Sequence, residues 1–196
     1  MPKIVDHEEQ RRAIAAQAAD WIARRGIDSL SLRNVADAFG CSKGMVQHYF
    51  VDKEELLFGA LLFVTNQYME RERAAVEGYQ GLARVERRFN VILPLTPALR
   101  DEWVVRLAFY ARAALVPKMQ QYLRDHVSAA LRGGVTELRE AQRAQELRTN
   151  INLVRAYRSV MATVAGIGVS EVVSPNVLSA ATQRRMLKDV LGALTP

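Results

Sequence analysis

The sequence predicts an all-α protein, and three observations support this prediction. Apolar residues recur at intervals of three and four along nearly every segment, which is the spacing of a helix buried on one side. Glycine, proline and hydroxyl residues stand between these segments, where such residues start or stop helices. No alternating pattern of a strand and no internal repeat is present. We therefore expect three short helices and then about six longer ones.

The first helix is predicted from about Asp6 to Arg25. Asp6 and Glu9 have the spacing of a capping box, in which each side chain satisfies a free amide of the first turn. Gly26 ends the helix. Its apolar stripe consists of Ile14, Ala15, Ala18, Trp21 and Ile22. We expect Trp21 to lie in the core of a three-helix unit.

Two short helices are predicted between Leu32 and Phe50. Ser31 and Ser42 stand at their starts, because a serine oxygen can accept a hydrogen bond from a free amide there. Gly40 lies between them, in a left-handed turn that glycine enters without strain. The residues expected to face inward are Val35, Ala36, Phe39, Cys41, Val46 and Tyr49. The residues expected to face outward are Lys43, Gly44, Met45, Gln47 and His48.

An outward face of this kind is what a helix-turn-helix presents to the DNA major groove. The alternative is an ordinary helical hairpin inside an all-helical core. Cys41, the single cysteine, permits no internal disulfide and is expected to be a small buried hydrophobe rather than a redox switch.

A long helix is predicted from Asp52 to about Val76, with Asp52 and Glu55 as a second capping box. We expect it to be the only segment shared by the two parts of the molecule. The later helices are expected over residues 82–92, 98–115, 117–146, 151–172 and 175–194. Pro94 and Pro97 should end the first of these.

Two details of the later helices depend on particular residues. Gly133 and Gly134 should kink or loosen the helix that contains them. Ser174 and Pro175 should start the last helix, as its cap and first residue.

Residues 8 to 55 resemble the DNA-binding domain of the TetR (tetracycline-repressor) family of bacterial transcription regulators. The segments that carry this resemblance are WIARRG, SLSLRNVADAFG, CSKGMVQHYF and DKEEL. The family has a recognition segment like G-V-S-x-G-x-x-Y-x-H-F, and Cys41 here replaces its usual Val. The HYF ending resembles the branch that contains the repressor of choline-to-betaine genes.

The resemblance implies a helix-turn-helix DNA-binding domain over residues 1–52 and a ligand-binding and dimerisation domain over residues 53–196. Its partners would be double-stranded operator DNA, a small-molecule effector and a second copy of the chain. The expected DNA-binding residues are Ser31, Arg33, Ser42, Lys43, Gly44, Met45, Gln47, His48, Tyr49 and Lys53. Among them Lys43, Tyr49 and Lys53 are expected mainly at phosphates, and Met45, Gln47 and His48 near bases.

The composition is compatible with a DNA-binding protein, but by itself it would not indicate this function. The net charge is +6, but residues 1–52 contain seven Lys or Arg and seven Asp or Glu. DNA affinity must therefore come from the arrangement of a few groups rather than from bulk charge. No apolar run is long enough for a membrane span, and residues 1–20 lack the apolar core of a secretory signal. We expect a cytoplasmic protein with no membrane partner.

The last two predicted helices are apolar on more than one face, which indicates burial on two sides. The interface residues we expect are Val154, Met161, Ala165, Gly168, Val177, Ala181, Leu187 and Leu191. A purely intramolecular core is the alternative. The family resemblance favours a dimer, since such proteins associate through their last two helices as a four-helix bundle.

A ligand cavity among the middle helices is implied by the same resemblance. The candidate ligand-binding residues are Phe89, Trp103, Arg106, Phe109, Tyr110, Met119, Tyr122, Tyr157 and Met161. Any one of these aromatic or methionine residues is more often core than pocket. In the choline-like case, Trp103 and Tyr110 would hold a quaternary ammonium by cation–π attraction, with Glu102 pointing to solvent.

The sequence gives little support for catalysis. His7, His48 and His126 are scattered, and there is no metal-ligand spacing, phosphate-binding loop or activated serine motif. We expect no enzyme activity, cofactor or metal. The remaining alternative is a helical small-molecule-binding or enzymatic domain with a degenerate head that does not bind DNA.

Overall fold

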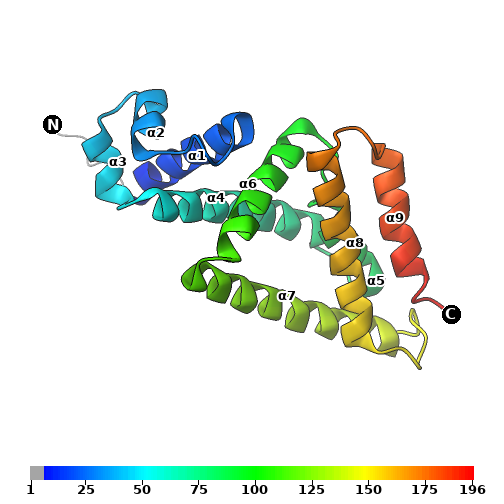
Figure 1. Ribbon diagram of the computed structural model, residues 1–196. Coiled ribbons are helices and arrows are strands. Elements are labelled where there is room, and N and C mark those ends of the chain that lie inside the picture. Colours follow the sequence, from blue (N-terminus) through cyan, green and yellow to red (C-terminus); the bar gives the residue numbers. More distant parts are fainter. Residues whose placement is uncertain (1–6) are drawn as a thin grey trace. The chain divides into compact units, whose positions relative to one another are not determined.

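The computed structural model describes residues 7–196, and over this range the chain is all-α, as predicted. The helices are α1 (His7–Arg25), α2 (Leu32–Phe39), α3 (Lys43–Tyr49), α4 (Lys53–Val76), α5 (Gly81–Asn90), α6 (Pro97–Ala113), α7 (Pro117–Arg143), α8 (Leu153–Val173) and α9 (Ala180–Gly192) (Figure 1). None of these described helices has the length and apolar character that a membrane crossing requires. The capping role expected of Asp6 lies outside the described residues.

The chain forms two compact units. The first contains the residues up to Gln67 together with Val104–Met119, and the second contains Tyr68–Trp103 together with Gln120–Pro196. Both α4 and α6 therefore begin in one unit and end in the other. The sequence-based expectation that α4 alone is shared was wrong, because the end of α6 packs within the first unit. The division at residues 52 and 53 stays a prediction.

The core of the first unit is built from the apolar stripe of α1 and the start of α4. Ile14, Ala18 and Ile22 are almost completely buried. Trp21 is only half-buried, contrary to the prediction, because its indole nitrogen donates to the Ser29 hydroxyl at 3.0 Å at the edge of the unit.

The last part of α6 completes the first unit against α4. The ring of Phe109 is fully buried and lies 5.8 Å from that of Phe58, measured between centroids. One helical turn later, Arg112 forms an ion pair with Glu54, and its Nε donates at 3.0 Å. An aromatic contact and an ion pair thus attach the end of α6 to the start of α4 within the first unit.

The core of the second unit is formed by α5, α7, α8 and α9, of which α8 and α9 lie side by side (Figure 1). Val160, Ile167 and Leu187 are fully buried there. The helix α7 continues through Gly133 and Gly134, and the kink or loosening expected there stays a prediction. A Cβ on Gly134 would lie 1.9 Å from the Tyr157 ring, so this glycine admits an aromatic side chain from α8.

Two other helix ends differ from the predictions. α5 ends at Asn90, four residues before Pro94, and Pro97 begins α6 instead of ending the previous helix. α7 ends at Arg143, and Gln145 soon after it has a left-handed φ of 62°.

The last helix begins later than predicted. Ser174 and Pro175 belong to the connection after α8, and Ser179 is the cap of α9. The reason is the carboxylate of Glu171, which accepts backbone hydrogen bonds from Asn176 at 3.1 Å and Leu178 at 2.7 Å. These bonds hold the connection as a turn, so helix cannot form there.

Candidate functional site

The two short helices α2 and α3 are set by their ends, as the sequence predicted. The hydroxyl of Ser31 accepts from the Asn34 amide at 3.0 Å, and that of Ser42 accepts from the Met45 amide at 3.2 Å. Gly40 has a left-handed φ of 78° and donates its amide to carbonyls at the end of α2. Both serine hydroxyls therefore fix the start of a helix, and their direct part in DNA binding stays a prediction.

The outer face of α3 is polar and open. Lys43, Gly44, Gln47 and His48 are exposed as predicted, and Met45 is half-buried. Val46 faces inward and is fully buried, which fixes the rotation of α3 about its axis. A short capped helix that presents side chains from its first turns has the form that enters a major groove.

Three residues expected inside the head lie partly outside it. Phe39, Cys41 and Tyr49 are half-buried, because the two helices are too short to cover them. The Cys41 thiol lies 3.5 Å from the carbonyl oxygen of Ser42, and burial raises its pKa. Cys41 is therefore less enclosed than the small buried hydrophobe that we expected.

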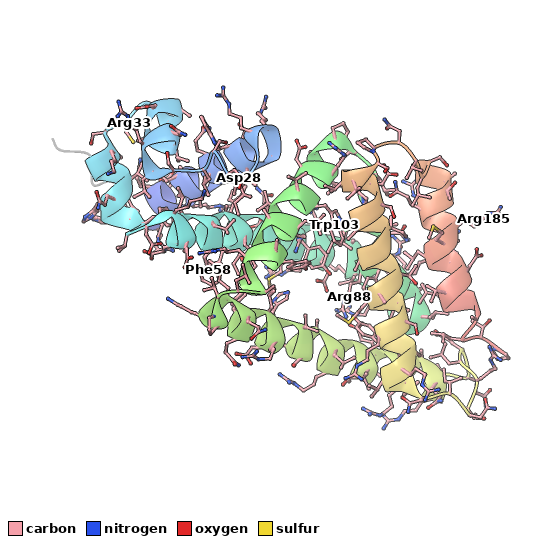
Figure 2. All side chains as sticks on the ribbon, in the orientation of Figure 1. Asp28, Arg33, Phe58, Arg88, Trp103 and Arg185 are labelled. Carbon is pink, nitrogen blue, oxygen red and sulfur yellow. The ribbon has the colours of Figure 1, made fainter. Side chains whose placement is uncertain are left out.

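Several polar groups surround α3. The ring of His48 lies 5.1 Å from that of Tyr49 and 5.7 Å from that of His7 at the start of α1, measured between centroids. Arg33 projects from α2 as an exposed side chain (Figure 2). Lys53 donates to the Asp28 carbonyl oxygen at 3.2 Å, so its ammonium is held at the loop before α2.

The predicted ligand residues are divided between the two units. Phe89, Trp103, Tyr122, Tyr157 and Met161 belong to the second unit. Arg106, Phe109, Tyr110 and Met119 belong to the first. Among these residues, the rings of Phe89 and Tyr157 come together at 5.5 Å.

The residues predicted to hold a quaternary ammonium have different environments. Trp103 is 4% exposed, donates its indole N–H to the Ile92 carbonyl oxygen at 2.7 Å and packs on Gly168. Tyr110, in contrast, is 40% exposed. The prediction that Trp103 and Tyr110 together hold a quaternary ammonium stays a prediction. Glu102 was expected to point to solvent, but it forms a bidentate ion pair with Arg71 of α4 at 2.7 and 2.8 Å.

Sequence reasoning missed a buried polar cluster in the second unit, which we call the Arg88 cluster. Arg88 of α5 donates to Glu72 of α4 at 2.6 Å and to Glu137 of α7 at 2.7 Å. Arg84, one turn earlier, donates to the same oxygen of Glu137 at 2.8 Å. The spacing of Arg84 and Arg88 was visible in the sequence, but nothing in it indicated that carboxylates of two other helices face them.

Two tyrosines enclose the Arg88 cluster. Burial, and then the nearby Glu72, raise the pKa of Tyr68, whose hydroxyl is hydrogen-bonded to that carboxylate. Burial also raises the pKa of Tyr157, against the lowering effect of its hydrogen bond with Arg88. Although burial opposes the charged guanidinium, that hydrogen bond and the carboxylates of Glu137 and Glu72 raise the pKa of Arg88. Arg88 is therefore a cation held in a largely desolvated place.

The predicted interface residues differ in how deeply they are buried. Leu187, Leu191 and Gly168 are buried in the core of the single chain, and their place in an interface stays a prediction. Val154, Val177 and Ala181 are exposed, while Met161 and Ala165 are half-buried. Val169 and Val173, which we did not predict, are 41% and 72% exposed. The helical period distinguishes an apolar stripe, but it does not show which stripe another element of the same chain covers.

The histidine that we weighed as a general base, His126, is exposed and stacks on Tyr122 at 5.9 Å between centroids. In the described range, no three His, Cys, Asp or Glu side chains gather as metal ligands would.

Comparison with known proteins agrees with this architecture. Residues 14–60 match the family "Bacterial regulatory proteins, tetR family", and residues 82–196 match "BetI-type transcriptional repressor, C-terminal". The transcriptional regulator PksA of Bacillus subtilis is 28% identical over 89% of this chain and 84% of its own length. The regulator BetI of Rhizobium meliloti is 27% identical over 63% of this chain and 61% of its own length.

Two solved structures have the same fold. A transcriptional regulator from Saccharomonospora viridis, crystallised in complex with choline, superposes with a TM-score of 0.85 at 24% identity, over 94% of this chain and 96% of that one. A transcriptional regulator from Rhodococcus sp. Rha1 superposes with a TM-score of 0.83 at 25% identity, over 94% and 95%.

Proposed function

We infer that this chain, which belongs to the TetR family of bacterial regulatory proteins and has a BetI-type C-terminal repressor domain, represses transcription until a small molecule releases it from DNA. It is a DNA-binding regulator and not an enzyme. Beyond this role, we propose that the protein binds a palindromic operator as a homodimer and that a small-molecule effector releases it. The observation that carries the proposal is the outer face of α3, with Lys43, Gln47 and His48 exposed on a helix capped at its start.

Base recognition is assigned to Gln47 and phosphate binding to Lys43. A glutamine amide can form two hydrogen bonds with adenine, whereas an ammonium contacts phosphates of any sequence. The operator can be selected from a random double-stranded library and its affinity measured against single-base variants. Gln47→Ala should lose about 1–3 kcal/mol on the preferred site and relax specificity at one position.

Lys43→Ala should weaken binding to all sequences alike and reduce the salt dependence by about one counterion. Lys118→Ala, which removes an exposed lysine from the start of α7, is the matched charge control. If Gln47→Ala keeps the sequence preferences of the wild type, the assignment of base recognition is wrong.

The dimer is assigned to the outer face of α8, which carries Val169 and Val173. Exposed valines on one helix favour contact with another apolar surface, and a two-fold symmetric dimer would match a palindromic operator. Val169→Glu should give monomers in sedimentation and lose operator binding. Val127→Glu, at a similarly exposed valine of α7, should remain a dimer. Dimeric Val169→Glu protein would reject this interface.

Release by an effector would act through the helices that the two units share. A ligand can change DNA affinity only by binding better to one spacing of the two α3 helices than to another. Small tilts at the far end of α4 or α6 move the head, and consecutive major grooves lie about 34 Å apart. Ligand and operator should then oppose each other by about 1–3 kcal/mol.

Choline is the first effector to test, because the Saccharomonospora viridis regulator was crystallised with it. Operator affinity would be measured at increasing choline, with sodium chloride at equal concentration as the ionic control. We expect a fall in affinity that saturates. A response identical to that with sodium chloride would exclude choline as the effector.

A further inference from the structure

We propose that the Arg88 cluster of the second unit is a binding site for a small organic cation that carries N–H donors, such as a guanidinium, an amidinium or a primary ammonium. The ligand would take the place of the Arg88 side chain between Glu72 and Glu137. Arg88 is then an internal cation that closes the site until the ligand displaces it.

The spacing of the two carboxylates supports this proposal. One guanidinium reaches both of them, with Nε of Arg88 at 2.6 Å from Glu72 Oε1 and Nη2 at 2.7 Å from Glu137 Oε1. The side chains of Arg88, Glu137 and Glu72 are only 15%, 12% and 21% exposed. Two carboxylates on different helices are thus placed one guanidinium apart, with most solvent excluded.

The hydrogen bonding of Glu137 is uneven. Both Arg84 and Arg88 donate to its Oε1, while its buried Oε2 has no hydrogen-bond partner among the described groups. A buried acceptor without a donor is uncommon in folded proteins. A ligand with a further N–H group can serve Oε2 as well as the two oxygens that Arg88 already occupies.

Aromatic side chains and two surface hollows complete the site. Tyr68 is hydrogen-bonded to Glu72, Tyr157 to Arg88, and the Phe89 ring lies 5.5 Å from that of Tyr157. Figure 2 shows Arg88 among the side chains between α7 and α8. A hollow of about 450 Å³ reaches Glu72, and another of about 570 Å³ reaches Glu137. Each of the two glutamates therefore borders a surface hollow.

The ligand class follows from the acceptors. Every oxygen of this cluster that Arg88 contacts accepts an N–H bond, and a quaternary ammonium has no N–H to give. Replacing one cation by another leaves the cluster neutral, since Arg84 and Arg88 balance Glu72 and Glu137. A neutral or anionic ligand would leave the cluster with two carboxylates and only the Arg84 cation, so one buried negative charge would lack compensation.

The same exchange has a regulatory consequence, which rests on the proposed function. Arg88 of α5 links Glu72 of α4 to Glu137 of α7, so its displacement removes one ion pair between the second half of α4 and α5. Because α4 also belongs to the first unit, which contains α2 and α3, cation binding would change the DNA affinity of that unit. Binding itself is measured without DNA, so a failure of the repressor proposal leaves this site testable.

The first experiment uses methylguanidinium as the probe and thermal unfolding and calorimetry as readouts. N-methylurea is the neutral control of the same shape, and tetramethylammonium is the cation without N–H groups. We expect methylguanidinium alone to bind the wild-type protein. Glu137→Gln should weaken this binding at least tenfold, whereas Glu140→Gln, an exposed residue of the same hollow, should not.

The second experiment removes the internal cation. Arg88→Ala should bind methylguanidinium at least tenfold more tightly than the wild type does, and the probe should restore much of the melting temperature that the variant loses. Arg87→Ala is the matched control, because Arg87 is exposed and stacks on Tyr79 instead. If Arg88→Ala does not fold without the probe, its recovery on refolding with methylguanidinium but not N-methylurea is the same test.

Three results would overturn the proposal. They are equal binding of methylguanidinium by Arg88→Ala and Arg87→Ala, equal binding by Glu137→Gln and Glu140→Gln, and binding of tetramethylammonium as tight as that of methylguanidinium. Failure of methylguanidinium to bind either wild type or Arg88→Ala would overturn it as well.

Discussion

Gly133 and Gly134 are neighbours in α7, yet alanine should have opposite effects at the two positions. Glycine inside a helix costs about 1 kcal/mol relative to alanine, because its backbone loses more freedom on folding. Nothing lies within 4 Å of a Cβ built on Gly133, so Gly133→Ala should gain this amount. A Cβ on Gly134 would lie 1.9 and 2.0 Å from two ring carbons of Tyr157.

The Tyr157 ring has no room to move away from such a Cβ. It is 2% exposed, the Phe89 ring lies 5.5 Å away, and its hydroxyl is hydrogen-bonded to Arg88. Overpacking of a rigid core costs about 1–3 kcal/mol, and this site belongs at the upper end. After the helix gain of about 1 kcal/mol, Gly134→Ala should lose about 2 kcal/mol.

Thermal unfolding followed by circular dichroism would measure both variants at one protein concentration. For a chain of this size, 1 kcal/mol corresponds to about 2–4 °C in Tm. Gly133→Ala should therefore melt about 2–4 °C above the wild type, and Gly134→Ala about 4–8 °C below it. If Gly134→Ala is as stable as Gly133→Ala, the packing of Tyr157 against α7 is wrong.

Three further predictions concern the helix cap, the core and the tyrosines. Ser42→Ala should lower stability by about 1 kcal/mol in urea unfolding and weaken operator binding, because the Met45 amide loses its acceptor; unchanged operator affinity would contradict this role of the cap. Leu187→Ala should cost about 2–5 kcal/mol in urea unfolding and leave a folded dimer, since this side chain is fully buried in the protomer. Because the pKa values of Tyr68 and Tyr157 are raised in the folded state, their contribution to stability is complete below about pH 10 and falls as pH rises further. Tyrosinate absorbance should show both residues ionising only with alkaline unfolding, and Tyr157→Phe should reduce that late phase alone.

The DNA-binding head was predictable from sequence because its determinants are local. Ser31, Gly40 and Ser42 act on backbone groups within four residues of themselves, so their spacing alone defines the ends of α2 and α3. Val46 sets the inward side of α3, and Gln47 and His48 then face outward. Helical period and caps contain this information without any knowledge of distant residues.

The second unit was less predictable because its decisive contacts join distant segments. Glu72, Arg88 and Glu137 lie on three helices, and no short-range pattern pairs them. Gly134 was expected to kink or loosen α7, and only the tertiary structure shows that the Tyr157 ring requires a glycine there. Sequence determined which faces of α8 and α9 are apolar; tertiary packing decided that Leu187 is covered within the protomer and Val173 is open, since burial depends on the elements that lie opposite.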